Sequence, residues 1–289
     1  MNLATAVSAS ARAAAGPVVP TAEELAVLGR RERLAVRFAE AVNRGARSKI
    51  GAQAFLRHVG QRWVWHATRR ITHLHGAEVL HTLDPRRGVL LCSNHRSFFD
   101  QFVLMAHYGR ALGHLPRLFF PVRSNFFYQG PLGMLVNGLM AGFSMYPPIF
   151  RDPKKSLFNR YTQARLVELL AQPDTVVGVH PEGRRGKGDD PYTLLPAQPG
   201  VGQLILEARP TVLPVFIHGL SNDIARQILG NYTGRARPIV IVLGRPLDLA
   251  LDGLPNRIRT HKQIADAVLD AIRDLGAQER EIRGKLASP

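Results

Sequence analysis

The sequence predicts an α/β fold in which a largely parallel β-sheet is flanked by helices, with an N-terminal helical extension. Two observations lead to this prediction. From Gly88 onward, short β-rich runs alternate with helical stretches, an order typical of parallel sheets whose strands are joined by crossover helices. Between Thr21 and Gly76, apolar residues instead recur at helical spacing. A chain of 289 residues can bury one substantial core, so we expect one catalytic domain over residues 77–289.

The N-terminal part divides into a tail and a helical region. Residues 1–20 are rich in Ala and Ser and lack the basic and apolar segments of a signal peptide. We expect them to form a disordered tail. Residues 21–76 begin with Thr21 and Glu24, spaced as in an N-terminal capping box. Two helices, broken near residues 45–51, are expected there.

The second of these helices carries indole rings beside arginines. Trp63 and Trp65 lie close in sequence to Arg62, Arg69 and Arg70. Both kinds of side chain are stabilised in the headgroup layer of a bilayer. One interpretation is an amphipathic helix that contacts a membrane. The other is a helix packed on the catalytic domain with a solvated basic face, because Trp also anchors ordinary cores.

The alternating region gives a defined set of elements. The expected strands are Val89 to Ser93, Arg117 to Val122, Phe143 to Tyr146, Thr175 to Val179, Thr211 to Ile217 and Pro238 to Leu243. The expected helices lie near Phe99 to Tyr108, Lys154 to Leu170, Pro199 to Ala208 and Ile258 to Leu275. Ligands of such sheets bind beyond the carboxyl ends of the strands, so the site is expected there.

Charge and composition restrict the partners. The formal net charge of +16 implies an acidic partner, which a nucleic acid, an anionic bilayer or a phosphorylated small molecule could each provide. The single cysteine, Cys92, excludes an internal disulfide and is natural in a reducing compartment. The most apolar stretch, Leu132 to Phe150, is interrupted by Asn137, glycines and prolines, so we expect no membrane-spanning helix.

A histidine and an aspartate follow the first expected strand of the sheet. His95 lies in a segment that leads from this strand into a helix, with Asp100 five residues later. A histidine can take a proton from a hydroxyl, and a carboxylate on its other nitrogen holds the tautomer and stabilises the imidazolium. In a continuous helix these positions would point about 140° apart. The pair can therefore meet only if the chain turns between them.

The same spacing occurs three times, so by itself it is weak evidence. We expect His261 and Asp266 to lie on a solvated face of the C-terminal helix. The residues after His218, which include Gly219, Ser221, Asn222 and Asp223, are expected to form a loop and a helix cap.

A second polar segment follows the strand that ends at Val179. It contains Glu182 and Gly183 followed by Arg184 and Arg185. A glycine turn flanked by arginines is suited to binding an anion, because the guanidinium group matches phosphate oxygens. The alternative is a loop with solvated surface charges.

The order of these motifs resembles that of the glycerolipid acyltransferase family, which includes the lysophosphatidate acyltransferases. The resemblance covers roughly Leu80 to Leu243. It rests on Asn94-His95 with Asp100, on Pro181-Glu182-Gly183, and on Val212-Leu213-Pro214-Val215. Arg184 departs from the family, which most often has a small or hydroxyl residue at that position.

The resemblance implies a role for each motif. His95 and Asp100 would form the acyl-transfer pair, Glu182 and Gly183 would belong to the acceptor phosphate site, and Pro214 would help to shape the pocket. Further phosphate-binding positions are implied by similarity, and they are Arg123, Arg151, Arg184 and Arg185. An alternative for Arg151 is a loop arginine paired with Asp152.

The function implied is transfer of a fatty acyl group from acyl-coenzyme A or an acyl carrier protein to a hydroxyl of a phosphorylated glycerolipid. The acceptor expected is lysophosphatidate, with another lysophospholipid or polar acceptor as an alternative. The donor is a substrate, and no cofactor is expected. No metal site is expected either, since His73, His75 and His81 lack a ligand framework. We expect a peripheral protein on the cytoplasmic side of a membrane, bound to its anionic surface.

Three other functions could be considered for a chain of this charge and fold class. A nucleic-acid-binding module would explain the charge, but the sequence has no helix-turn-helix, zinc-finger or RNA-recognition signature. An esterase would need a G-x-S-x-G nucleophile motif, which is absent. A membrane-binding protein that keeps the fold without catalysis stays open, and activity toward a thioester would distinguish it.

Overall fold

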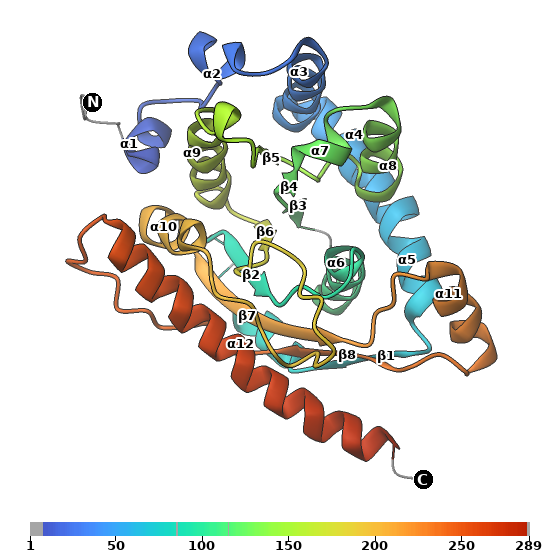
Figure 1. The fold of residues 1–289 in the computed structure, drawn as a ribbon. Coiled ribbons are helices and arrows are strands. Elements are labelled where there is room, and N and C mark those ends of the chain that lie inside the picture. Colours follow the sequence, from blue (N-terminus) through green and yellow to red (C-terminus); the bar gives the residue numbers. More distant parts are fainter. Residues whose placement is uncertain (1–7, 85, 115, 288–289) are drawn as a thin grey trace.

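The computed structural model describes residues 8–84, 86–114 and 116–287. Its centre is a six-stranded sheet with the strand order β1-β8-β7-β2-β6-β3 (Figure 1). The strands of this sheet are β1 (Thr72–His75), β2 (Val89–Ser93), β3 (Arg117–Phe119), β6 (Thr175–Val179), β7 (Thr211–His218) and β8 (Ile239–Leu243). A separate two-stranded sheet pairs β4 (Val122–Arg123) with β5 (Pro148–Ile149).

The sheet is largely parallel, as predicted. β2 lies inside it and pairs in parallel with both β6 and β7, and β3 pairs in parallel with β6. β8 runs antiparallel to β7 and is followed at the edge by β1, which is parallel to β8. The carboxyl ends of β2, β6 and β7 therefore lie side by side.

Helices of the described residues cover both faces of the sheet, some packed directly on it and others packed on those helices. Twelve α-helices are described. They are α1 (Ala9–Ala14), α2 (Ala22–Ala26), α3 (Arg30–Arg44), α4 (Ala46–Phe55), α5 (Gln61–Thr68), α6 (Asp100–Leu112), α7 (Ser124–Phe127), α8 (Pro131–Ala141), α9 (Phe158–Leu170), α10 (Pro199–Ala208), α11 (Ile224–Thr233) and α12 (Ile258–Ala287). A π-helical segment η1 (Leu56–Gly60) joins α4 to α5, and two 3-10 turns are η2 (Ala77–Thr82) and η3 (Pro153–Lys155).

The burial of β2 explains why it reads as a continuous apolar run. Leu90 and Cys92 belong to the core cluster that α9, α10 and α12 cover, whereas Val89 and Leu91 belong to the cluster with most of the apolar residues of α6. Successive side chains of a strand point to opposite faces, so a strand buried on both faces has no polar alternation. Figure 1 shows α12 running across one face of the sheet and α6 on the other.

The N-terminal region is helical, as predicted, and the expected break falls at Gly45 between α3 and α4. The expected disordered tail needs correction over the part that the structure describes. α1 is capped by Ser8, and Ala9 is buried in the core cluster that includes residues of α9. Small alanines permit this close packing, which low sequence complexity concealed. Residues 1–7 lie outside the described residues.

One strand prediction was wrong and one strand was missed. Residues 143–146 form no strand, because Phe143 has a φ of +59° and the chain turns there; the nearby strand is β5, which begins two residues after Tyr146. β1 was missed because its four residues follow α5 closely and read as the end of a helix. Short edge strands depend on a distant partner, here β8, more than on their own composition.

None of the helices in the described ranges is long and apolar enough to cross a bilayer. The two tryptophans differ. Trp65 packs against the core with Arg69 and Arg110 over its ring, at 5.2 and 4.9 Å from the ring centre, whereas Trp63 is 37% exposed.

Candidate active site

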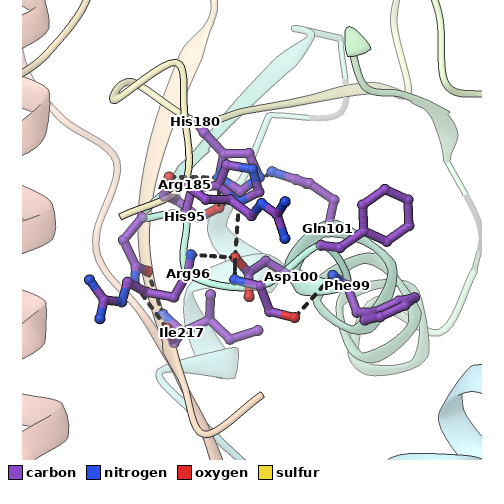
Figure 2. A network of polar contacts seen from close by, with 12 residues as sticks. His95, Arg96, Phe99, Asp100, Gln101, His180, Arg185 and Ile217 are labelled. Carbon is purple, nitrogen blue, oxygen red and sulfur yellow. Dashed lines mark hydrogen bonds and ion pairs between the residues drawn. The ribbon is translucent and has the colours of Figure 1, made fainter. Parts of the chain in front are cut away.

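His95 and Asp100 meet at the carboxyl end of β2, as the sequence required of them. The Nδ1 atom of His95 lies 3.0 Å from Oδ2 of Asp100, which is the first residue of α6 (Figure 2). The same oxygen accepts the backbone N–H groups of Arg96 at 2.7 Å and Ser97 at 2.8 Å. The turn between β2 and α6 therefore wraps around the carboxylate, and this turn brings the pair together.

The protonation states suit a base. Burial, together with the smaller effects of the positive charges on Arg185 and Arg123, lowers the pKa of His95 to about 4. Burial raises the pKa of Asp100 to about 6, against the opposing effects of His180 and the backbone N–H groups. At neutral pH the imidazole is therefore neutral and the carboxylate ionised. With Nδ1–H donating to Asp100, the Nε2 lone pair of His95 is the basic site.

The second motif is joined to the first by Glu182. Its carboxylate is buried, with Oε1 accepting the backbone N–H of His95 at 2.8 Å and Oε2 accepting that of Leu195 at 2.7 Å. Burial raises the pKa of Glu182. Both oxygens are thus occupied by the protein backbone. The placement of this carboxylate therefore favours a structural role, in which it joins the loops of His95 and Leu195, over direct contact with an acceptor phosphate.

Gly183 is required by the turn. Its φ is +65°, and a Cβ there would lie 2.8 Å from Cγ of Gln198. The loop then returns to the first motif, because Gly186 donates its N–H to the carbonyl of His95 at 2.9 Å. The two motifs therefore form one hydrogen-bonded unit.

Asn94 joins this unit to β7. Its amide accepts the N–H of Ile217 at 2.8 Å and donates to the carbonyl of the same residue at 2.9 Å. Pro214 lies within β7 opposite Cys92. It lines neither of the two apolar pockets described below.

The arginines converge beside His95. The pKa of Arg123 is lowered by burial and then by the charges of Arg185 and Arg184, and that of Arg151 by burial and then by Arg123 and Arg184. None of these four exposed arginines forms an ion pair within the described ranges. A group of mutually repelling cations without carboxylates is suited to an anion.

The rival placement of Arg151 is not found. Asp152 accepts the N–H of Lys154 at 3.0 Å as the cap of η3, and Arg151 instead donates to the carbonyl of Gly183. Arg151 therefore reaches the second motif. Arg185 lies 3.4 Å from Oδ1 of Asn222, which is also 3.1 Å from the N–H of Phe98.

The other two histidine and aspartate pairs do not meet. Asp223 caps α11 by accepting the N–H of Arg226, as predicted. Asp266 pairs with Lys262. His261 is only 7% exposed and bonds Asn256 at 2.6 Å, so the expected solvated face is wrong for this residue, because α12 packs on α10.

His180 is a site residue that the sequence did not single out. Its ring lies parallel to that of His95, with 3.8 Å between centroids and 8° between planes. Figure 2 shows both rings together beside Asp100. Its Nδ1 atom lies 3.0 Å from the carbonyl of Ser93. The available signal was its place immediately after β6, which pairs with β2.

Within the described ranges, one group of side chains could in principle hold a metal ion, namely His95, Asp100 and His180. The lone pairs of an imidazole lie in its ring plane. Two nearly parallel planes 3.8 Å apart cannot both contain one ion at bonding distance. The arrangement suits proton transfer better than metal binding.

Two apolar pockets lie among α5, α6 and α8, and only the first reaches the loop that carries the pair. The first is lined by Phe99 and Ser221 near the site, together with residues of α5, α6, α8 and α11. The second shares Val64, Phe102 and Met140 with it and continues toward β3.

The fold is that of an α/β enzyme whose polar side chains gather at the carboxyl ends of parallel strands. The acyltransferase family model matches residues 71–218, slightly more than half of the chain, and the chain belongs to the acyltransferase family. Among solved structures, it is similar to that of the 1-acyl-sn-glycerophosphate (LPA) acyltransferase PlsC from Thermotoga maritima, at 16% identity over 88% of this chain and 86% of that chain, with a TM-score of 0.45. No curated protein matches the sequence.

Proposed function

We propose that this acyltransferase moves a fatty acyl group from an acyl thioester to the free hydroxyl of lysophosphatidate. The observation that carries the proposal is the placement of His95, paired with Asp100, beside four arginines that form no ion pair with a carboxylate of the described residues. An acceptor with a hydroxyl and a phosphate close together matches this combination. Such an acceptor also agrees with the motifs that the chain shares with glycerolipid acyltransferases.

The reaction needs one base and no covalent intermediate. Nε2 of His95 takes the proton of the acceptor hydroxyl as its oxygen attacks the thioester carbonyl. The tetrahedral intermediate then loses the thiolate, and the imidazolium returns the proton to that sulfur. An ester and a free thiol result. Asp100 stabilises the imidazolium between these steps.

Cys92 is unsuited to act as a nucleophile. It is fully buried within β2, and burial raises the pKa of its thiol. A protonated thiol inside the sheet can neither attack nor reach a substrate. Direct transfer to the acceptor is therefore the simpler path.

The arginines position the acceptor. Arg123, Arg151, Arg184 and Arg185 would bind its phosphate through charge-assisted hydrogen bonds. Fixing the phosphate orients the hydroxyl toward Nε2, which turns an encounter into an oriented reaction. Arg184 adds a cation where the family most often has a small or hydroxyl residue, and this favours a doubly charged phosphate monoester.

The two apolar pockets would hold the acyl chain. Of the apolar residues near the motifs, Phe99 and Met140 line the first pocket. Phe99 directly precedes Asp100, so the pocket begins beside the reacting groups.

We also propose that the protein binds peripherally to the cytoplasmic surface of an anionic membrane. Exposed apolar side chains lie on adjoining α3, α4, η1 and α8, namely Leu34, Phe38, Ile50, Val59, Leu132, Leu135 and Leu139. Exposed arginines lie among them on α3, α4 and η1. Such a mixture suits the interface of an anionic bilayer. Sedimentation with phosphatidylglycerol vesicles should exceed that with phosphatidylcholine vesicles, and Leu135→Asp with Leu139→Asp should abolish it.

The test of the reaction is release of free thiol from acyl-coenzyme A by the purified protein, with acyl carrier protein as the second donor. Lysophosphatidate should support release, and monoacylglycerol, which lacks only the phosphate, should not. His95→Ala should abolish release. Equal rates with both acceptors would show that the acceptor phosphate is not recognised. Undiminished release by His95→Ala would show that His95 is not the general base. Silence with both donors and with other lysophospholipids would favour a binding protein that keeps the fold.

A further inference from the structure

The stacked histidines raise the question of what fixes the catalytic ring. The hydrogen bond between His95 and Asp100 holds one edge of the imidazole, at Nδ1. The ring is otherwise anchored only through its Cβ–Cγ bond, so it can still pivot about that bond while the hydrogen bond bends. Such a pivot would move Nε2, the atom that must face the acceptor hydroxyl. A second restraint is needed to fix the plane of the ring.

His180 supplies a surface for that restraint. Its ring stacks on the face of the His95 ring, with 3.8 Å between the ring centroids and 8° between the ring planes. This ring is itself held, because Nδ1–H donates to the carbonyl of Ser93 at 3.0 Å, and the carbonyl of His180 accepts the N–H of Gly183 at 2.9 Å. Parallel pairing of Cys92 with Val179 places these two loops side by side. The ring of His180 is therefore held at the carboxyl edge of the sheet.

The charge of His180 matters as well as its shape. It is half-buried and donates its Nδ1 proton to the carbonyl of Ser93. A neutral ring offers its π face to the imidazolium that forms on His95. A cationic ring in the same place would repel that imidazolium.

We propose that His180 is a positioning residue for acyl transfer: its neutral ring, stacked on His95, holds the plane of the catalytic imidazole so that Nε2 faces the acceptor hydroxyl. The proposal rests on the proposed function. It assigns to the residue before Pro181 a role that the hydrogen bonds of the motif do not provide.

The test compares His180→Phe, which keeps a stacking ring but loses the hydrogen bond to Ser93, with His180→Ala, which loses both. His180→Ala should lower kcat about 10- to 100-fold, as expected for a misplaced base, with KM for both substrates within about twofold. His180→Phe should stay within about threefold of wild type. His261→Ala, which removes a buried histidine from α12, controls for general loss of packing, and its kcat should stay near that of wild type.

A second readout does not depend on acyl transfer. The imidazole of His95 can be titrated by NMR, with its signal assigned by its loss in His95→Ala. His180→Ala should raise its pKa toward the ordinary value, because the ring becomes solvated, whereas His180→Phe should not. An unchanged His95 pKa in His180→Ala, a kcat within twofold of wild type, or an equal loss in His180→Phe would overturn the proposal. Absence of transfer by the wild type would overturn the proposed function alone, and the titration would still test whether the His180 ring shields the imidazole of His95.

Discussion

The backbone N–H of His95 donates to Oε1 of Glu182 over 2.8 Å, and this contact ties the catalytic loop to the loop that carries the arginines. Oε2 of the same carboxylate accepts the N–H of Leu195. One buried side chain thus satisfies two backbone donors that would otherwise lie unpaired. Glutamate is needed here for its two acceptor oxygens, more than for its charge.

Glu182→Gln should therefore damage stability and catalysis together. Glutamine has one acceptor oxygen, so one of the two buried N–H groups loses its partner, at a cost of about 1–3 kcal/mol. We expect a lower Tm and a lower kcat, measured by thermal unfolding and thiol release. Glu281→Gln, on an exposed position of α12, is the control and should change neither. An unchanged Tm combined with a raised KM for lysophosphatidate would instead place Glu182 in direct contact with the acceptor.

The pH dependence of transfer should follow the His95 and Asp100 pair. The pKa of Asp100 is raised to about 6 and that of His95 is lowered to about 4, and such close groups titrate as a pair. As pH falls through about 6, Asp100 gains a proton and no longer stabilises the imidazolium. We expect kcat to rise between pH 5 and 7 and then to level.

Asp100→Asn should remove that dependence. The amide can still accept from the backbone of Arg96 and Ser97 but carries no charge, so kcat should fall about 10²- to 10⁴-fold and lose its acidic limb near pH 6. Asp266→Asn, which breaks only the pair with Lys262, is the matched control. Retention of the acidic limb in Asp100→Asn would assign it to another group.

Much of this site follows from local sequence. Strands β2 and β6 were predicted with their observed bounds because both are short apolar runs with polar segments immediately after them. The sequence also predicted that His95 and Asp100 could meet only if the chain turned between them. What sequence could not give is the stacking of His180, which depends on the register between two strands that lie far apart in the chain.

The missed elements have similar causes. α8 is apolar on most of its surface and contains glycines, so it shows no helical periodicity, and its cap Gly142 lies next to the mispredicted strand. β1 gains its structure from pairing with β8. The packing of α1 depends on α9, which follows in sequence only after the whole N-terminal region.

The buried side chain of Lys49, on α4, is expected to make the unfolding free energy depend on pH. It is 6% exposed, bonds Oδ1 of Asn43 at 2.8 Å and lies 3.9 Å from the ring centre of Phe119. Burial, followed by the charges of Arg117 and Arg165, lowers its pKa from 10.5 to about 7. Between pH 7 and 10.5 the unfolded chain binds the extra proton, so the unfolding free energy rises with pH in this window and is lowest below it.

Lys49→Met should therefore raise the Tm most at pH 6, where the buried charge is present, and less at pH 9. Loss of the bond to Asn43 offsets part of the gain, so we expect an increase of a few degrees. Differential scanning calorimetry of the variant and wild type at both pH values measures the difference. Lys154→Met, at an exposed position, should show no pH-dependent gain. A variant that is less stable at both pH values would mean that the ammonium group contributes more than its burial costs.

Arg151→Gln should weaken binding of the acceptor lysophosphatidate more than it lowers kcat. The guanidinium donates to the carbonyl of Gly183 and lies among the cations beside His95. A lost charge-assisted hydrogen bond of about 1.5–3 kcal/mol corresponds to a rise of about 10- to 100-fold in KM for lysophosphatidate. Arg226→Gln, an exposed arginine on α11, should leave KM unchanged. A fall in kcat with constant KM would move Arg151 from phosphate binding to the reaction itself.

Ala67→Phe should shorten the acyl chains that the enzyme accepts. Ala67 lies on α5 and lines the first apolar pocket together with Phe99 and Phe102. A phenyl ring there fills space that the far end of a long chain would occupy, and each methylene excluded forfeits about 0.8 kcal/mol of burial. The ratio of kcat/KM for long-chain to short-chain acyl-coenzyme A should fall at least tenfold, with short-chain activity retained. Ala277→Phe, on the exposed face of α12, should leave the ratio unchanged. Equal loss for all chain lengths would show that the ring disturbs the site, and an unchanged ratio would place the acyl chain outside this pocket.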